Sequence, residues 1–284
     1  MTYYLPILGA VALAVGTILE RIVLRIKKVG VEFYQTASFL AIIIFLLPLL
    51  YFFWEIDSSA FETKNIILFL LVVFFSTIAN LLVFYSLKWE KVGNLEPARV
   101  LEPLFVILLA IIFSFFAEDL YERNLKIIIP ALIAALALVF THIKKHHLQF
   151  NPYFIAAVFG SFFFALELII SRMILDFYSP VAFYFLRCLS IFLISLLVFR
   201  PDFKTKAGKG TMWQIFLTGF VWVVYRIVVY YGYLKVGVIF TTLMLMLGSV
   251  FIYAMAYFIL KEKLSWRNLV ASLVVIASVV YALA

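Results

Sequence analysis

Charged side chains interrupt apolar runs that are otherwise long enough to cross a lipid bilayer. The interrupting residues are Glu20, Arg21, Glu96, Arg99, Glu102, Glu167, Arg187 and Arg226. A charge at the centre of a lipid-facing helix costs about 2.5–3.5 kcal/mol on insertion scales. Carboxylates and guanidinium groups occur in equal number, so internal pairing can offset this cost. We therefore expect most of them to face the protein interior, while Arg21 and Glu96 have the alternative of reaching the lipid headgroups.

The depth of these charges predicts which of them pair. We call the face where the first apolar run begins face A and the opposite face B. Counting 1.5 Å per residue through alternating crossings puts Glu20 and Arg99 toward face B. The same count puts Glu167, Arg187 and Arg226 toward face A. We predict that Glu20 pairs with Arg99, and Glu167 with Arg187 or Arg226, beside a cavity that alternately opens to the two faces. The alternative is that these pairs only lock helices together.

An aromatic face accompanies the deepest arginine. Trp222, Tyr225, Arg226 and Tyr230 recur at three- and four-residue steps, which places them on one side of a helix. Ring hydroxyls and a guanidinium group in a cavity would hold a substrate with an apolar body and a charged head. The amide of Asn80 would bind either the substrate or its own helix. The predicted substrate-binding or coupling residues are Glu20, Asn80, Arg99, Glu102, Glu167, Arg187, Trp222, Tyr225 and Arg226.

The elements that must position these residues are membrane-spanning helices. The chain has 284 residues, of which 67% are hydrophobic and 13% charged. A crossing needs about 20 apolar residues, so ten crossings leave no room for a large domain outside the membrane. The expected runs are Tyr3–Leu24, Val31–Phe53, Ile66–Leu87, Leu95–Phe116, Leu125–Ile143, Tyr153–Ser171, Pro180–Phe199, Met212–Leu234, Val238–Leu260 and Asn268–Leu283. We expect an all-α integral membrane protein with ten transmembrane helices.

The chain also repeats itself. The motif Glu-x-Leu-x-x-Arg-Asn-Leu begins at Glu118 and recurs at Glu262, a shift of 144 residues (262 − 118). Glu20 recurs as Glu167, a shift of 147 residues (167 − 20). Each repeat would hold five crossings, and because five is odd the second copy must be inverted relative to the first. The predicted domains are residues 1–148 and residues 149–284.

The stretch from Arg99 through Pro103 to the Glu118-Asp119-Leu120 turn resembles the fourth helix and following turn of the EamA-type drug/metabolite transporter superfamily. The second half repeats the turn at Glu262 but has Leu247 where the first has Pro103. The resemblance implies a ten-helix carrier that moves small metabolites or drugs by alternating access, often as an exporter. Glu20 occupies the position of a titratable glutamate on the first helix of the small multidrug-resistance transporters, which makes proton coupling a hypothesis.

Other functional classes find little support in the sequence. No Gly-x-x-x-x-Gly-Lys-Ser/Thr loop is present, so ATP hydrolysis is not expected to drive transport. The histidines near residue 145, flanked by lysines, indicate contact with lipid headgroups rather than a metal site, and the basic charge of +8 indicates a membrane surface rather than nucleic acid. We expect no cofactor, no metal and no enzyme activity. A membrane enzyme, a lipid flippase, a nucleotide-sugar carrier and a scaffold stay open as alternatives.

The expected partners are a small-molecule substrate such as an amino acid or similar zwitterion, protons as coupling ions, and membrane lipids. The chain would act as a monomer or homodimer in the plasma (cell inner) membrane. Lysine and arginine are more frequent in the connections on face B, which favours a cytoplasmic face B with the termini outside. The family resemblance implies the opposite orientation.

Overall fold

The structure of the protein, a computed structural model, describes residues 5–26, 28–90, 95, 98–117, 121–142, 151–201, 208–260 and 265–284. Its helices are α1 (Leu5–Leu24), α2 (Val31–Phe53), η2 (Ser58–Phe61), α3 (Thr63–Trp89), α5 (Leu101–Ser114), α6 (Leu125–His142), α7 (Pro152–Ile174), η3 (Leu175–Phe177), α8 (Pro180–Phe199), α9 (Lys209–Lys235), α10 (Val238–Leu245), α11 (Leu247–Leu260) and α12 (Trp266–Leu283). Seven of these described elements are long and apolar enough to cross a membrane, and three shorter apolar helices complete the set. The predicted all-helical membrane fold is confirmed.

Several helices begin where side chains cap them. The Asn151 side chain accepts a hydrogen bond from the N–H of Phe154 at 2.7 Å, and the Ser179 hydroxyl accepts one from Ala182 at 3.2 Å. A proline follows each cap, at the first helical position, where its missing N–H has no cost. These caps explain why α7 and α8 start abruptly at the membrane boundary.

The fourth and ninth predicted runs are interrupted rather than continuous. Ala98 and Arg99 are helical, Val100 is a turn, and α5 begins at Leu101. Pro103 accounts for this break, because a proline ring clashes with the carbonyl four residues earlier, here that of Arg99. In the ninth run Met246 separates α10 from α11, and the Ser249 N–H donates to the Met246 carbonyl at 3.0 Å, a tightened turn. Both halves therefore contain a broken helix.

The two halves cross the membrane in opposite directions. Three crossings take the chain from the start of α1 on face A to the end of α3 on face B. The Asn151 amide, just before α7, donates to the Glu90 carboxylate at 2.6 Å, and the Ser86 hydroxyl donates to the Tyr153 carbonyl at 2.8 Å. α7 therefore begins on the face where α3 ends, opposite the face where α1 begins. This is the inverted arrangement that the repeat predicts.

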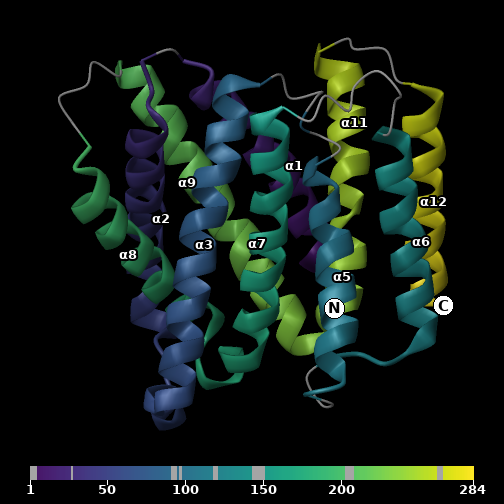
Figure 1. Ribbon diagram of the computed structural model, residues 1–284, viewed down its shortest axis with the longest axis horizontal. Helices are drawn as coiled ribbons and strands as arrows, with labels where there is room; N and C mark the ends of the chain where they lie inside the picture. The colour runs from purple at the N-terminus through teal and green to yellow at the C-terminus, as the bar shows by residue number, and fades with distance from the viewer. Residues whose placement is uncertain are drawn as a thin grey trace.

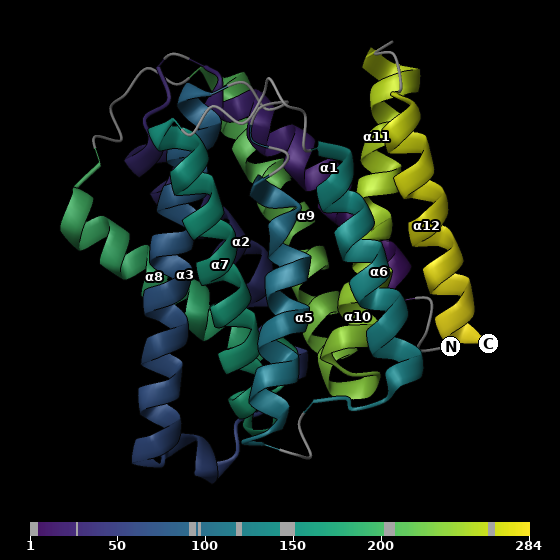
Figure 2. The same cartoon turned by 45° about the vertical axis from the view of Figure 1, so that its right-hand side comes forward.

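Helices of one half lie against helices of the other. α3 packs along α7 and α1 packs along α9, so the first helix of each half contacts the third helix of its counterpart. α2 also packs against α8, and α6 packs against α12. Figure 1 shows α2, α3, α7, α8 and α9 gathered on one side of the molecule, and Figure 2 shows α6, α11 and α12 on the other, with both termini toward face A.

A short backbone pairing joins the halves on face A. Ile56, before η2, forms an isolated antiparallel bridge with Tyr178, after η3. The Asp57 N–H donates to the Phe177 carbonyl at 2.8 Å, and the Ser179 N–H donates to the Glu55 carbonyl at 2.9 Å. The α2–α3 connection and the α7–α8 connection are thus held together.

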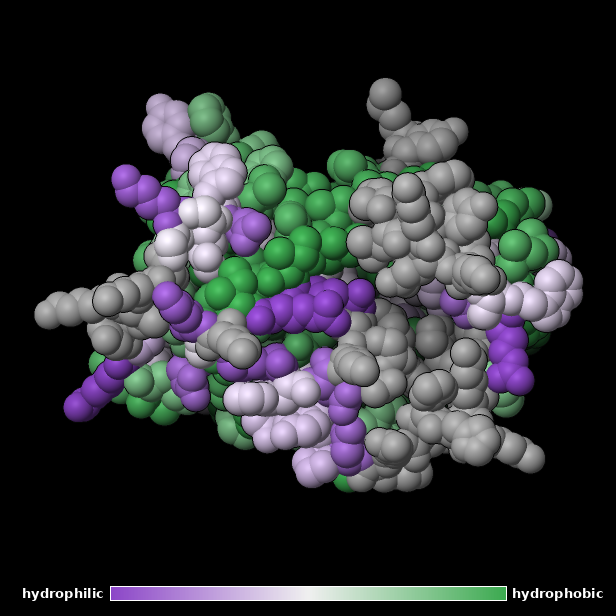
Figure 3. All heavy atoms as spheres, turned by 90° about the horizontal axis from the view of Figure 1, so that it is seen from above, coloured by the Kyte–Doolittle hydropathy of each residue, from purple (hydrophilic) through white to green (hydrophobic). Residues whose placement is uncertain are grey.

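Some sequence predictions fall on residues outside the described part of the chain. These are Glu96, Glu118, Asp119, Leu120, Glu262 and the predicted domain boundary at residues 148 and 149. His146 and His147 lie outside it as well. Figure 3 views the molecule from face B, where hydrophilic side chains lie across the middle beside an apolar area.

Candidate functional site: an interior charged cavity

Glu167 on α7 lies at the centre of a buried ionic network. Its Oε1 is 3.0 Å from Arg187 Nη1, and its Oε2 is 3.3 Å from Arg226 Nη1. The side chain of Glu167 is 0% exposed, and that of Arg187 is 2% exposed. The sequence predicted that Glu167 pairs with either Arg187 or Arg226, and the structure shows Glu167 within ion-pair distance of both arginines.

Hydroxyl groups complete this network. Arg187 donates from Nε and Nη2 to the Ser76 hydroxyl at 3.1 and 2.8 Å, and from Nη1 to the Tyr230 hydroxyl. The Tyr230 and Ser171 hydroxyls each donate to Glu167 Oε1 at 3.2 Å. Ser76 lies on α3, so the network joins the two halves. Glu167 Oε2 and Arg226 Nη1 are within ion-pair distance but make no hydrogen bond. We call this cluster of Glu167, Arg187 and Arg226 the staple, because removing one partner from a buried ion pair is strongly destabilising.

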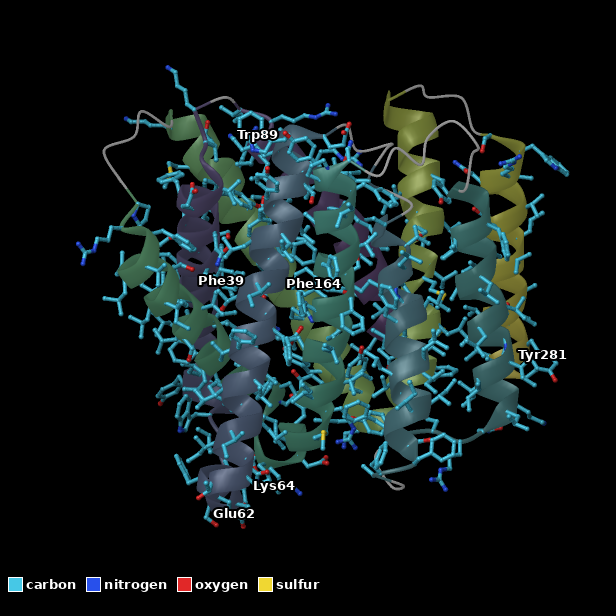
Figure 4. All side chains as sticks on the ribbon, viewed as in Figure 1. Phe39, Glu62, Lys64, Trp89, Phe164 and Tyr281 are labelled. Atoms are coloured by element: carbon cyan, nitrogen blue, oxygen red, sulfur yellow. The ribbon has the colours of Figure 1, made fainter. Side chains whose placement is uncertain are left out.

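A cavity of about 70 Å³ lies in front of the staple. The predicted residues that border it are Glu20, Asn80, Arg99, Glu102, Arg187, Trp222, Tyr225 and Arg226. Glu167 is the exception, since the two arginines cover it. Phe39 and Phe164 also border this cavity, and Figure 4 shows both near mid-height, between Trp89 at one end of α3 and Glu62 and Lys64 at the other. The cavity therefore lies at mid-depth between the halves.

The charges on the face-B side of the cavity are not directly paired. Among the described residues, Glu20, Arg99 and Glu102 form no ion pair, and Arg99 Nη1 is buried without a hydrogen-bond partner. Glu20 interacts electrostatically with Arg99 and with the Tyr34 hydroxyl, and Glu102 with Arg99 and Arg226. The predicted Glu20–Arg99 contact is therefore a proximity across the cavity rather than a closed salt bridge.

The aromatic face of α9 lies where its spacing predicts. Tyr225, Arg226 and Tyr230 are buried, and the ring of Trp222 meets that of Tyr225 edge to face at 5.3 Å. The guanidinium of Arg226 lies 5.7 Å from the ring centre of Phe164 and 5.8 Å from that of Tyr225. This wall combines an apolar surface with one cation.

Asn80 serves its own helix as well as the cavity. Its amide nitrogen donates to the Ser76 carbonyl at 2.7 Å, and Ser76 in turn holds Arg187. Sequence reasoning considered both possibilities for Asn80 and missed Ser76. The i,i+4 spacing of Ser76 and Asn80 was the available signal, because it puts both on one helix face. Tyr34 and Tyr184 were also missed, since tyrosine is common throughout this chain.

A second cavity, of about 100 Å³, adjoins the first. The two share Leu13, Arg99, Glu102 and Tyr225 as lining residues. The second cavity lies between the two helix breaks, because Val100 and Pro103 line it from one and Leu245 and Met246 from the other. Arg99 and Glu102 therefore stand at the junction of two compartments.

Comparison with known proteins finds a family match in the second half of the chain. Residues 151–284 match the model of the EamA-like transporter family. No curated protein matches the chain. A solved structure whose title reads only "Crystal structure of protein" is similar, with a TM-score of 0.68 at 14% identity, over 99% of this chain and 95% of the other. At that identity the likeness shows a shared fold over both halves, and not a shared substrate. The second half of the chain, residues 151–284, is an EamA-like transporter family domain.

Proposed function

We propose that the protein is a secondary transporter that moves a small zwitterionic metabolite, such as an amino acid, out of the cell by alternating access. Family membership of the second half implies a transporter. The substrate, the direction and the energy source are the proposal. The single observation that carries it is the contrast between the closed Glu167 staple and the open charges of Glu20, Arg99 and Glu102 at a mid-depth cavity.

Open charges at a cavity favour a ligand that carries opposite charges. A buried charge without a partner is costly, so a bound group that pairs with it stabilises the complex. Arg99 would take a carboxylate, and Glu102 or Glu20 an ammonium group. A zwitterion supplies both at once, and it needs no net change in the charge of the cavity.

The same charge count supports proton coupling. The open set contains two carboxylates and one guanidinium, so a bound zwitterion leaves one carboxylate unpaired. A proton on that carboxyl would complete the neutralisation. Glu20 fits this role, because it lies beside the Tyr34 hydroxyl at the edge of the site and makes no direct ion pair with a described residue.

Cavity size favours a compact substrate. Volumes of about 70 and 100 Å³ are well below the roughly 300–1,000 Å³ of pockets for drug-sized ligands. A nucleotide sugar would require a much larger opening than a small amino acid. A polar cavity at mid-depth is also the feature that distinguishes a carrier from a scaffold with a dry interior.

The test uses purified protein in proteoliposomes with radiolabelled L-alanine. We expect uptake that excess unlabelled L-alanine inhibits, and that neither propionate nor ethylamine inhibits at the same concentration. Arg99→Gln should abolish uptake, whereas Arg172→Gln, a matched change at an ion pair with Asp176 outside the cavity, should not. Equal inhibition by propionate or by ethylamine would refute zwitterion recognition.

A further inference from the structure

The second cavity contains two hydroxyl groups that the protein itself does not use. Thr17 on α1 and Ser249 on α11 both line it. Within the described residues no side-chain hydrogen bond is found for either hydroxyl. Thr17 is only 3% exposed, so its hydroxyl is withdrawn from bulk solvent. Other hydroxyls of the membrane helices, such as those of Thr77 and Thr242, donate to their own backbones instead.

The Thr17 and Ser249 hydroxyls are not repeated in the other half of the chain. The 147-residue shift that relates Glu20 to Glu167 relates Thr17 to Phe164 (164 − 17). The 144-residue shift relates Ser249 to Phe105 (249 − 105). The matching positions of the other half thus carry phenyl rings, and the Phe105 ring packs edge to face on Phe162 at 5.5 Å. The Thr17 and Ser249 hydroxyls therefore have no counterparts at the matching positions of the other half.

The second cavity is also within reach of the proposed charged-head site. Arg99 and Glu102 line both compartments, so a zwitterionic head bound there has the second cavity directly beside it. α11 lies close to α1 at this level, because a Cβ on Gly248 would stand 3.1 Å from the Ala10 carbonyl oxygen. Thr17 on α1 and Ser249 on α11 line the same space between these two helices.

We infer that the second cavity is a side-chain subsite, in which Thr17 and Ser249 select zwitterionic substrates with a short, uncharged side chain that can hydrogen-bond, such as a hydroxyl. This inference rests on the proposed function, since it assumes that the charged head binds at Arg99 and Glu102. Hydroxyls that make no hydrogen bond within the protein are available to a ligand, and a ligand hydroxyl in this cavity would otherwise lose its hydrogen bonds to water. The polar residues of the first cavity are mainly charged, and its hydroxyl from Ser38 donates to the Gln35 carbonyl of its own helix.

The experiment compares two ligands of the same shape. L-Threonine and L-valine differ only by a hydroxyl in place of a methyl group, so their affinity ratio isolates hydrogen bonding in the side-chain subsite. Dissociation constants for both are measured by thermal shift and by inhibition of L-alanine uptake. The wild type should bind L-threonine about three- to tenfold more tightly than L-valine, the range expected from one or two net hydrogen bonds.

The variants are Thr17→Val and Ser249→Ala, each of which removes one hydroxyl and little volume. Each should lower the threonine-to-valine ratio, and the double variant should bring it to about one while L-alanine still binds. Thr77→Val is the matched control, because it removes a buried hydroxyl bonded to its own helix, and it should keep the wild-type ratio. Melting temperatures without ligand report whether each variant folds.

The outcomes separate the two proposals. A wild-type ratio of one, or a ratio that survives in the double variant, overturns the side-chain subsite while zwitterion binding stands. Failure of L-alanine, L-threonine and L-valine alike to bind the wild type overturns both the proposed function and the inference.

Discussion

Arg187 Nη1 lies 3.0 Å from Glu167 Oε1, between side chains that are 2% and 0% exposed. Both groups are charged, and both lie in the middle of apolar helices. Arg226 adds a second cation to the same carboxylate. Since Glu167 lies within ion-pair distance of both arginines, this cluster joins α7, α8 and α9 in the interior of the protein.

Removing the carboxylate should therefore destabilise the protein. Glu167→Gln leaves Arg187 and Arg226 buried without their counter-ion, and we expect a loss of about 3–5 kcal/mol, as for other broken buried pairs. Thermal unfolding of the purified variant in detergent measures it. Glu20→Gln is the matched control, with little loss expected because Glu20 forms no direct ion pair with a described residue. Equal melting temperatures for the two variants would contradict the staple.

Proton coupling is predicted to depend on Glu20. Glu20→Gln keeps the shape of the side chain and removes its titrating group, so a pH gradient should no longer drive L-alanine accumulation in proteoliposomes. Exchange of internal for external L-alanine should persist, because exchange needs no net proton movement. Accumulation by the variant at the wild-type rate, with the wild-type pH dependence, would show that the carboxyl is structural.

Arg99 is predicted to bind the carboxylate of the substrate. Arg99→Gln should weaken the binding of L-alanine by about 2–5 kcal/mol, the usual effect of truncating a buried charged partner. Isothermal titration in detergent gives the dissociation constant. Binding of ethylamine-like cations, if any, should be unchanged or stronger, because the positive charge is removed. An unaltered dissociation constant for L-alanine would assign the carboxylate to another group.

A glycine at the entrance to α10 provides a structural prediction. Gly237 has a φ of +92°, a left-handed conformation, and a Cβ there would lie 2.1 Å from Glu122 Oε1. Glu122 accepts hydrogen bonds from the N–H groups of Ile239 and Phe240 at 3.1 and 3.0 Å, so it cannot move away without uncapping the helix. Gly237→Ala should cost at least about 1 kcal/mol of stability, and Gly210→Ala, in open space, should cost much less. Similar melting temperatures for Gly237→Ala and Gly210→Ala would contradict the proposed role of Glu122 as the cap of α10.

Orientation is tested by a reporter that is active only in the cytoplasm, fused after Ala284. The charge distribution predicts that face B is cytoplasmic and that this reporter is silent. A bright signal would reverse the orientation and agree with the one that the family resemblance implies. A second fusion in the connection after Arg200, on face B, should give the opposite result and serves as the control.

The sequence predicts the spans and the composition of the cavity for a physical reason. Charges such as Arg99 and Arg226 are too costly in lipid, so they turn inward and meet. The sequence could not predict which of the buried glutamates forms direct ion pairs with arginine. Glu20 and Glu167 match in the repeat, yet only Glu167 has two arginines within ion-pair distance, which depends on the packing of α8 and α9. Thr17 and Ser249 gave no signal, because a hydroxyl on an apolar helix most often bonds its own backbone.

The bridge between Ile56 and Tyr178 bears on which parts of this carrier move as one body. It ties a hairpin of the first repeat to a hairpin of the second, and α3 and α7 pack along each other above it. Separating the two repeats from each other would break this backbone pairing and the α3–α7 packing, so we expect α2, α3, α7 and α8 to move together in any change of shape. Such a moving body would combine helices from both repeats.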